Sequence, residues 1–338
     1  MNADQNKILA VDNSIVTATL LGQPSTAIEG LPLTTVSGEI ALKVVNVAQV
    51  PTLPPTLLLA NFASNTAPWN VASLGSVSKF RLVGTDLYLD WPSKATTITV
   101  GTCNVGGVTV LNFVGCSALT VLNASSKGLQ SLNLAGLQSL TSLSCQYNSI
   151  KTLDLSPCPA LTAVFCQNSL TFLLTSLILL GTKLVTLDCS GNRGLGAPSL
   201  NFSGQSALQD LNCTFCDLAS IDLSFVGPSL VFLRAGSNLL TTVNFGVKPN
   251  IVSIFLNDNK ITSLNLSGLV ATNISTANFR NNLMPSALVD AIWIRLEQSS
   301  QGSGNGDTAG TGNGPVVSVA AQLAIVNLTS AGWDCQFN

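Results

Sequence analysis

Apolar residues recur through the middle of this chain with a period of about twenty-one residues, and polar residues fill most positions between them. The clearest copy begins at Leu140 and reads LTSLSCQYNSIKTLDLSPCPA. Apolar residues take its first, fourth, eleventh, fourteenth and sixteenth positions, Cys takes the sixth and Asn the ninth. This frame is typical of leucine-rich repeats, in which each copy forms one coil. A single coil cannot bury its apolar side, so we predict a solenoid of stacked coils that share one continuous core.

The copies define the central region of the chain. Coils begin at Leu119, Leu140, Leu161, Leu184, Leu208, Leu230, Ile251 and Ile274, with weaker copies from Val77 and Ile98. We therefore predict a leucine-rich repeat solenoid of about nine to ten coils over residues 77–283. The longer coils carry their extra residues in the tail, which places these insertions on one rim of the solenoid.

The region before the solenoid does not follow the repeat. Residues 1–76 contain short β-type runs broken by Pro and Gly, and we predict a β-rich N-terminal region that attaches the protein to an assembly or caps the first coil. Because this region is small for a core of its own, we expect it to mediate homo-oligomerisation or docking into a multicopy assembly. Residues 1–14 lack the basic start and apolar run of a secretory signal.

Residues 284–338 are predicted to cover the other end of the core. Helical spacing of apolar residues extends from Pro285 to Gln298, and a second helix is predicted over 319–330. The sequence between them, QGSGNGDTAGTGNGP, is rich in Gly and Asn and predicts a loop. Residues 333–337 predict a last strand. The predicted fold class is therefore a repeat solenoid with a β-rich N-terminal element and an α/β C-terminal cap.

Cysteine recurs at the sixth position of the coils, in Cys103, Cys145, Cys166, Cys189 and Cys213. Ala, Leu and Phe take this position elsewhere, so the position is apolar and a thiol there packs as a small hydrophobic group. One interpretation is a ladder of buried, reduced thiols, and the other is a disulfide or metal site. Parallel strands point these thiols the same way, which disfavours disulfides, and without His only Cys213 and Cys216 form a short pair for zinc. We predict the thiol ladder and no metal, and we leave open whether a disulfide forms at Cys116, Cys158, Cys216 or Cys335.

Asparagine forms a second ladder at the ninth position, in Asn148, Asn192, Asn238, Asn259 and Asn282. A buried amide at a sharp turn can satisfy backbone groups of its own coil and of the neighbouring coil. We predict a structural role for all five residues.

The strand that carries the Cys also predicts a binding surface. Side chains alternate along a strand, so the third, fifth and seventh residues of each coil point away from the core and line the concave side. These residues are small and polar in the early coils, and from the coil at Leu161 onward they include aromatic and charged side chains. We predict that contact is made through Phe165, Asp188, Asp210, Phe232, Arg234, Phe255, Asn257 and Arg280. The alternative is that a shifted register or a neighbouring subunit buries the Phe side chains.

Composition narrows the possible partners and activities. Only 9% of the residues are charged and the net charge is -2, so the chain lacks the basic field that nucleic acid binding requires. Hydrophobic residues make up 46%, but the most apolar run, residues 170–180, is too short to span a bilayer. The chain has no His, no Gly-x-Ser-x-Gly motif and no phosphate-binding Gly loop. We predict a protein that is not an enzyme and that has no cofactor, no nucleic acid partner and no membrane span.

The coil from Leu140 to Ser156 resembles the cysteine-ladder leucine-rich repeats of internalin J-like bacterial surface proteins, and the resemblance covers residues 98–283. Two features depart from the pattern: Ala takes the sixth position in two coils, and the coil over 161–183 is irregular. The resemblance implies an adhesive role through binding of protein or glycan.

A second resemblance involves the C-terminal region, which is similar to the end of leucine-rich repeat proteins encoded by bacteriophages. It is carried by Asn282, Leu283, Val289–Ile292, Leu296, Gly332, Trp333 and Asn338. This resemblance implies a virion component, such as a fibre, a decoration protein or a receptor-binding protein. We therefore expect a virion structural protein that contacts other virion proteins, or a glycan or protein of the host surface. The alternative is an internalin-like adhesin on a bacterial cell surface.

Overall fold

The computed structural model describes the backbone and side chains of residues 119–338, except residues 127, 169–173, 197–199, 270–272 and 300–301, and before residue 119 it describes only the backbone of strands. The chain divides into two compact units, Met1–Leu161 and Thr162–Asn338, called here the N-terminal and the C-terminal unit. The domain boundaries predicted at residues 76 and 283 stay predictions.

Short strands make up the regular structure described in the N-terminal unit. Before residue 119 they are β1 (Lys7–Ala10), β2 (Val16–Leu20), β3 (Gln23–Pro24), β4 (Glu39–Lys43), β5 (Thr56–Ala60), β6 (Phe62–Ala63), β7 (Asn70–Ala72), β8 (Lys79–Val83), β9 (Asp86–Asp90), β10 (Thr97–Val100), β11 (Cys103–Asn104) and β12 (Val110–Asn112). They are followed by β13 (Val121–Asn123), β14 (Ser131–Asn133), β15 (Ser142–Ser144) and β16 (Thr152–Asp154). Strands β1 to β3 pair antiparallel, as does β8 with β4 and β9, which agrees with the predicted β-rich N-terminal element.

The coils of the N-terminal unit confirm the leucine-rich repeat frame. β13 and β15 pair in parallel with Leu122 opposite Leu143, and β12 and β14 pair in parallel with Leu111 opposite Leu132. Leu122, Leu132 and Leu143 are buried, and the strand residues on either side of each are more exposed. Apolar residues one coil apart therefore stack into a core, as the period of the sequence predicts.

The two weakest copies of the repeat differ from the prediction. The segment that begins at Val77 contains β8 and β9, which pair antiparallel, and so it does not form a parallel coil like those that follow. In β10, Ile98 lies opposite Leu122, so Ile98 takes the fourth position of its coil rather than the first. Cys103 is consequently not at the sixth position. It lies in β11, which pairs with β6.

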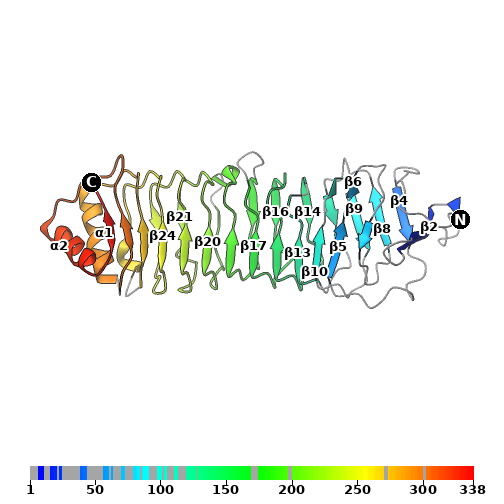
Figure 1. Ribbon diagram of the computed structural model, residues 1–338, viewed down its shortest axis with the longest axis horizontal. Helices are drawn as coiled ribbons and strands as arrows, with labels where there is room; N and C mark the ends of the chain where they lie inside the picture. Colours follow the sequence, from blue (N-terminus) through cyan, green and yellow to red (C-terminus); the bar gives the residue numbers. More distant parts are fainter. Residues whose placement is uncertain are drawn as a thin grey trace. The chain divides into compact units, whose positions relative to one another are not determined.

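Parallel strands of three residues stack through the C-terminal unit (Figure 1). They are β17 (Ala163–Phe165), β19 (Thr186–Asp188), β20 (Asp210–Asn212), β22 (Phe232–Arg234), β24 (Ser253–Phe255) and β25 (Thr276–Asn278). The middle residue of each strand is buried opposite the middle residue of the next, from Val164 to Ala277. The other side of these coils carries β18 (Ser176–Ile178), η3 (Arg193–Gly196), β21 (Ile221–Asp222), β23 (Val243–Asn244) and η4 (Leu266–Gly268).

A left-handed residue follows the strand in nearly every described coil, at the eighth position. The non-glycine examples are Ser126, Tyr147, Phe215, Ser237, Asp258 and Asn281, with φ between 53° and 58°. Bulky side chains rarely adopt this conformation, because the Cβ approaches the following carbonyl oxygen. The ninth residue comes directly afterwards, so this turn directs its side chain back into the coil. The conformation at Tyr147 and Phe215 is thus imposed by the coil and not favoured by the residue.

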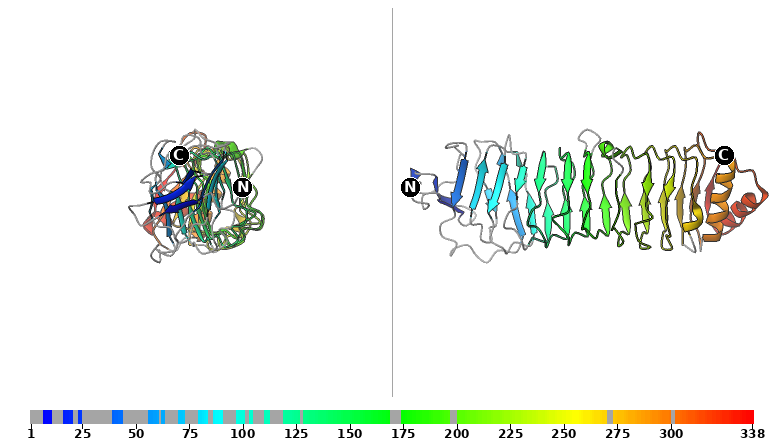
Figure 2. Two further views of the ribbon diagram at one scale, coloured as in Figure 1. Left: turned by 90° about the vertical axis from the view of Figure 1, so that its right-hand side faces the viewer. Right: turned by 180° about the vertical axis from the view of Figure 1, so that it is seen from behind.

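The C-terminal cap consists of α1 (Ser286–Ser299), α2 (Val319–Ser330), β26 (Asn305–Asp307) and β27 (Asp334–Gln336) (Figure 2). Both helices and the last strand lie where the sequence predicts them. α1 buries Val289, Ile292, Trp293 and Leu296, and α2 packs on α1 and contacts β27. Of the part of the chain that the structure describes, neither helix is long and apolar enough to cross a membrane.

One strand of the cap lies where the sequence predicts a loop. β26 pairs in parallel with β25 and β27, so the cap adds two strands to the stack instead of only covering it. The middle residue of β26 is Gly306, and a Cβ built on it would lie 2.6 Å from the Trp293 ring. Trp293 therefore fills the core position that a strand side chain fills in the other coils. This packing explains why a Gly-rich sequence forms a strand here.

Candidate functional site

The residues predicted to form a binding surface occupy successive strands of the C-terminal unit. Cross-strand partners are Phe165 and Asp188, then Asp210 and Phe232, then Arg234 and Phe255. Asn257 and Arg280 lie two residues beyond the same strand positions in β24 and β25. We call this surface the outer face of the C-terminal unit. It comprises the third, fifth and seventh residues of the coils from β17 to β27.

Phe232 and Arg234 form the most exposed aromatic and cationic pair of this face. Phe232 is 36% exposed, and the Arg234 guanidinium carbon lies 5.6 Å from the centroid of the Phe232 ring. Arg234 Nη1 also donates to Asp210 Oδ1 at 2.6 Å. An ion pair this exposed contributes only roughly 0–1 kcal/mol to stability. The contacts therefore orient Arg234 beside a Phe232 ring that stays partly exposed, while Phe165 and Phe255 are half-buried.

Carboxylates of the outer face cap the ends of their own strands. Asp188 Oδ1 accepts from the backbone N–H of Ser190 at 3.0 Å, and Asp188 Oδ2 accepts from Asn212 Nδ2 at 3.2 Å. Asp307 Oδ1 accepts in the same way from the backbone N–H of Ala309 at 2.9 Å. These bonds fix the side chains at the fifth position and leave part of each polar group facing solvent.

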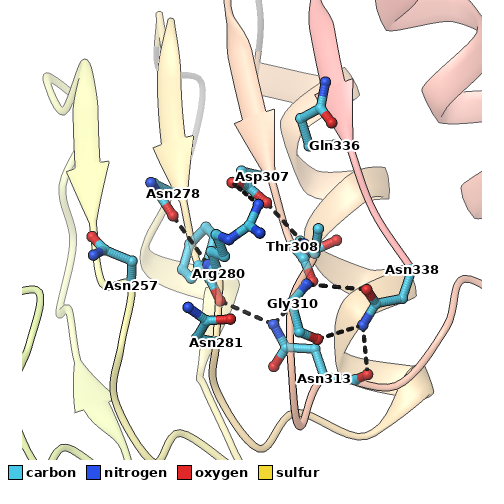
Figure 3. Close-up of polar contacts among 12 residues, drawn as sticks. Asn257, Asn278, Arg280, Asn281, Asp307, Thr308, Gly310, Asn313, Gln336 and Asn338 are labelled. Atoms are coloured by element: carbon cyan, nitrogen blue, oxygen red, sulfur yellow. Dashed lines mark hydrogen bonds and ion pairs between the residues drawn. The ribbon is translucent and has the colours of Figure 1, made fainter.

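Polar side chains gather at the C-terminal end of the outer face, across β24 to β27 (Figure 3). Arg280 Nη1 lies 3.6 Å from Asp307 Oδ2, and Asn278 Oδ1 accepts from the backbone N–H of Arg280. Asn338 donates to the carbonyl oxygens of Gly310 and Asn313. We call Asn257, Asn278, Arg280, Asp307 and Gln336 the amide cluster. Sequence reasoning did not place Asp307 on this face, because β26 lies in a segment whose composition predicts a loop. It did not place Gln336 there, because the last strand was predicted as part of a cover and not as a further strand of the stack.

The ninth-position asparagines are buried and join neighbouring coils. Asn192 Nδ2 donates to the carbonyl oxygens of Cys166 and Cys189 at 3.0 and 2.8 Å, and Asn192 Oδ1 accepts from the backbone N–H of Leu174. Bonds of the same kind are made by Asn148, Asn238, Asn259 and Asn282. In the cap, Asn313 makes these bonds to Phe279, Thr308 and Met284. Asn313 was not predicted, because it lies two residues later in its coil than the frame requires.

The coil from Leu208 has Cys216 in place of the ladder Asn. Cys216 Sγ lies 3.3 Å from the carbonyl oxygen of Cys189, where the other coils have an amide donor. A thiol is a weak donor and offers no carbonyl oxygen to accept from the preceding coil. That preceding coil instead closes its turn by the 3₁₀ helix η3, in which the N–H of Leu195 donates to the carbonyl oxygen of Asn192 at 3.0 Å.

The sixth-position cysteines of the described coils are buried in the core. Burial raises the pKa of the Cys145 thiol to about 12, and it raises the pKa of Cys213 well above its ordinary value. The pKa of Cys189 is also raised well above its ordinary value, first by a hydrogen bond with Cys216 and then by burial. Cys158 and Cys216 are likewise buried with free thiols, Cys166 is buried, and Cys335 is half-buried with a free thiol. Cys103 and Cys116 lie outside the residues whose side chains are described.

Among the described residues, no group of three His, Cys, Asp or Glu side chains is placed to hold a metal ion. Lys248 is a buried cation of the C-terminal unit. Its ammonium group donates to the carbonyl oxygens of Val226 and Val247 at 2.8 and 3.3 Å. Burial lowers the pKa of Lys248 to about 8, against a smaller opposing effect of Asp222. Lys248 is on the far side of the coil from the strand residues and touches no outer-face residue in these bonds.

No protein-family model and no curated protein matches the chain. Among solved structures, it is similar to YopM from Yersinia enterocolitica WA-314, with 22% identity, a TM-score of 0.42, and coverage of 58% of this chain and 45% of YopM. It is also similar to the functional domain of InlJ from Listeria monocytogenes, which includes a cysteine ladder, with 21% identity, a TM-score of 0.42, and coverage of 64% and 60%. For Listeria monocytogenes InlP the identity is 17%, the TM-score 0.37, and the coverage 66% and 62%. The chain thus spans less than two thirds of each of these chains.

The class of the fold follows from the coils themselves. Stacked coils with the L-x-x-L frame, a parallel strand in each coil and an Asn ladder define a leucine-rich repeat solenoid. Such solenoids present extended surfaces for binding.

Proposed function

We propose that this protein is a non-enzymatic binding protein that contacts its partner through the outer face, centred on Phe232, Arg234 and Phe255. The observation that carries the proposal is the exposure of the Phe232 ring beside a guanidinium that Asp210 holds in place. Aromatic rings and Arg are the residue types that contribute most to contacts between proteins. The core does not require Phe232 to be aromatic, because Leu233 supplies the buried side chain of that strand.

We further propose that the protein acts in a bacteriophage particle, as a fibre, decoration or receptor-binding component. The support for this setting is the resemblance of the C-terminal region, from Asn282 to Asn338, to leucine-rich repeat proteins encoded by bacteriophages. The partner is then another virion protein, or a glycan or protein of the host surface. The alternative is a bacterial surface adhesin of the internalin-like type, which is supported by the frame of the coil from Leu140.

Two measurements test the proposal. Mass spectrometry of purified virions is expected to find the chain at many copies per particle, and its absence from them would favour the adhesin. In a binding assay on intact host cells, the double variant Phe232→Ala/Arg234→Ala is expected to bind more weakly than the wild type with nearly the same melting temperature. A large loss of stability would place Phe232 in the core, and unchanged binding would remove the outer face as the contact surface.

A further inference from the structure

The amide cluster continues the outer face toward the cap, in two rows of side chains. The first row follows cross-strand partners from Phe255 to Asn278, Asp307 and Gln336. The second row lies two residues further along each strand and includes Asn257 and Arg280. In Figure 3 the Arg280 side chain lies between the strands of Asn278 and Asp307 and extends toward the Asp307 carboxylate. Because the strands are parallel, these polar groups are held side by side.

Local hydrogen bonds fix the orientation of these side chains and leave defined groups for a ligand. Asn278 uses its Oδ1 on the backbone N–H of Arg280, and no described residue accepts from its Nδ2. Gln336 donates from Nε2 to Asp334 Oδ1 at 2.7 Å, which leaves its Oε1 as an acceptor. The Arg280 side chain is 50% exposed, so part of it is accessible to a ligand. Donors and acceptors that are already oriented bind at a smaller entropic cost than mobile ones.

The charges around the cluster disfavour an anionic ligand. Arg280 is its one cation and is paired with Asp307. Asp258, beside the cluster, accepts from the amides of Asn257 and Asn281 at 2.6 and 2.7 Å. Asp258, Asp307 and Asp334 each contact a side chain of the cluster, and Arg234, which lies opposite Phe255, is paired with Asp210, so carboxylates outnumber guanidiniums at this end of the outer face. A sulfate, phosphate or sialic acid group would meet net negative charge there, whereas an uncharged ligand would not.

We infer that the amide cluster, together with the half-buried ring of Phe255, binds a neutral saccharide. Each sugar hydroxyl both donates and accepts a hydrogen bond, which matches the mixture of Asn278 and Arg280 donors with Gln336 and Asp307 acceptors. The Phe255 ring lies opposite Asn278 in the neighbouring strand and offers an apolar surface for the C–H face of a sugar ring. This inference rests on the proposed function, because it names the ligand class for the same outer face.

The variant Asn278→Asp tests the inference without disturbing the turn. Asp188 and Asp307 occupy the same fifth position and accept the same kind of backbone bond that Asn278 accepts, so Asp is compatible with the coil. The change replaces the free amide donor by a carboxylate and adds a negative charge. Asn123→Asp is the matched control, because Asn123 takes the fifth position of a coil in the N-terminal unit and accepts from the N–H of Ser125.

The experiment applies the full-length chain to an array that carries neutral glucans, galactans and N-acetylhexosamine oligosaccharides beside sialylated and sulfated glycans. The wild type and Asn123→Asp are expected to bind at least one neutral class and not the acidic ones. Asn278→Asp is expected to bind that class about tenfold more weakly or worse, since the loss of one oriented hydrogen bond and the added charge both oppose binding.

Three results would overturn the inference: no neutral glycan bound by the wild type, binding confined to acidic glycans, or equal binding by Asn278→Asp and the wild type. The cell-binding assay separates this failure from failure of the proposed function. If Phe232→Ala/Arg234→Ala weakens binding to host cells while Asn278→Asp does not, the outer face contacts a protein and the saccharide site is wrong. If neither variant changes binding to cells, the proposed function fails as well.

Discussion

At the scale of single residues, the amide of each ladder Asn supplies bonds that the sharp turn cannot make within its own coil. Asn238 shows the full set, because its Nδ2 donates to the carbonyl oxygens of Cys213 and Ala235 while its Oδ1 accepts from the N–H groups of Cys216 and Leu218. Replacing this side chain leaves four buried backbone groups without these partners. Buried polar groups that lose their partners are destabilising, so the ladder is expected to be sensitive to single substitutions.

Asn238→Ala is expected to lower the free energy of unfolding by about 3 kcal/mol, because several buried backbone groups lose their hydrogen bonds. Urea unfolding followed by circular dichroism measures the loss. Asn250→Ala is the control, since Asn250 is exposed and donates only to the carbonyl oxygen of Pro228. Equal stability of the two variants would contradict the structural role of the ladder.

Lys248 makes stability depend on pH through its depressed pKa. The unfolded chain holds the Lys248 proton up to about pH 10.5, its ordinary value, and the folded chain only up to about 8. Between these values the unfolded state binds more protons, so this residue makes the free energy of unfolding rise with pH. Buried thiols such as Cys145 act in the opposite direction above pH 9, since their pKa is raised in the folded state.

The readout is therefore the difference between the wild type and Lys248→Met, a variant of similar length without the charge. We expect the stability of the wild type relative to this variant to increase between roughly pH 7 and roughly pH 9. Urea midpoints at the two pH values measure this difference. A constant difference would show that the ammonium group is hydrated in the folded protein.

The thiols offer a further test at this scale. Cys335 is half-buried, whereas the other described cysteines are buried, and burial raises the pKa of Cys145 to about 12 and that of Cys158 to about 11. Burial also raises the pKa of Cys335, but its thiol is more accessible, so Cys335 should react with a thiol reagent before the six buried thiols in the native protein. Peptide mapping after brief labelling identifies the site. Rapid labelling of Cys145 or Cys166 would contradict the burial of the ladder.

At the scale of elements, the sequence predicts the strands and helices whose apolar residues are regularly spaced. The strands around Leu122, Leu187 and Leu233 and the helix α1 all follow from the positions of their buried residues. β26 could not be predicted, because its core position is Gly306 and the side chain that fills it, Trp293, comes from α1. The repeat is recognised by the apolar side chains of its own strands, so it cannot be recognised where a helix supplies the core side chain instead.

The sequence likewise predicts some residues of the candidate site and not others. The outward direction of Phe232 and Arg234 follows from strand alternation alone, and the structure places both on the outer face. The amide cluster depends on β26, which pairs with β25 after α1 and its loop return the chain to the stack, and on β27, which pairs with β26 after α2. The prediction that Cys103 belongs to the thiol ladder is wrong for a related reason. A shift of the repeat frame by three residues leaves the local apolar pattern intact but moves Cys103 out of the ladder strand.

The packing of β26 under α1 can be tested with a matched pair of glycines. Gly306→Ala places a Cβ 2.6 Å from the Trp293 ring, whereas a Cβ at Gly302 meets no atom within 4 Å. Gly306→Ala is expected to lower the free energy of unfolding by about 1–3 kcal/mol, because the ring or the strand must shift. Gly302→Ala should stay close to the wild type. Thermal unfolding followed by circular dichroism compares the two variants, and equal melting curves would disprove the contact.

At the scale of the whole molecule, assembly is expected to depend on the N-terminal region rather than on the coils. Residues 1–76 are apolar and interrupted by Pro, and a region of this size buries little core by itself. A chain that lacks residues 1–50 is therefore expected to keep the far-ultraviolet circular dichroism of the coils but to lose its association. Light scattering after size-exclusion chromatography compares the two chains. If the shortened chain associates like the full-length one, the contact lies elsewhere.

The substitution of Cys216 for an asparagine has a consequence for how the C-terminal unit comes apart. Each ladder amide couples its coil only to the preceding one, so the stack behaves as a series of nearest-neighbour links. The link between the coils of β19 and β20 has the Cys216 thiol in place of the amide. The turn of the β19 coil is instead closed within that coil by η3. Under slow heating or mechanical tension, a series of links separates first at its weakest member. The stack should therefore part between Cys189 and Cys213, with β17 and β19 on one side and the outer-face residues from Asp210 to Gln336 still joined on the other.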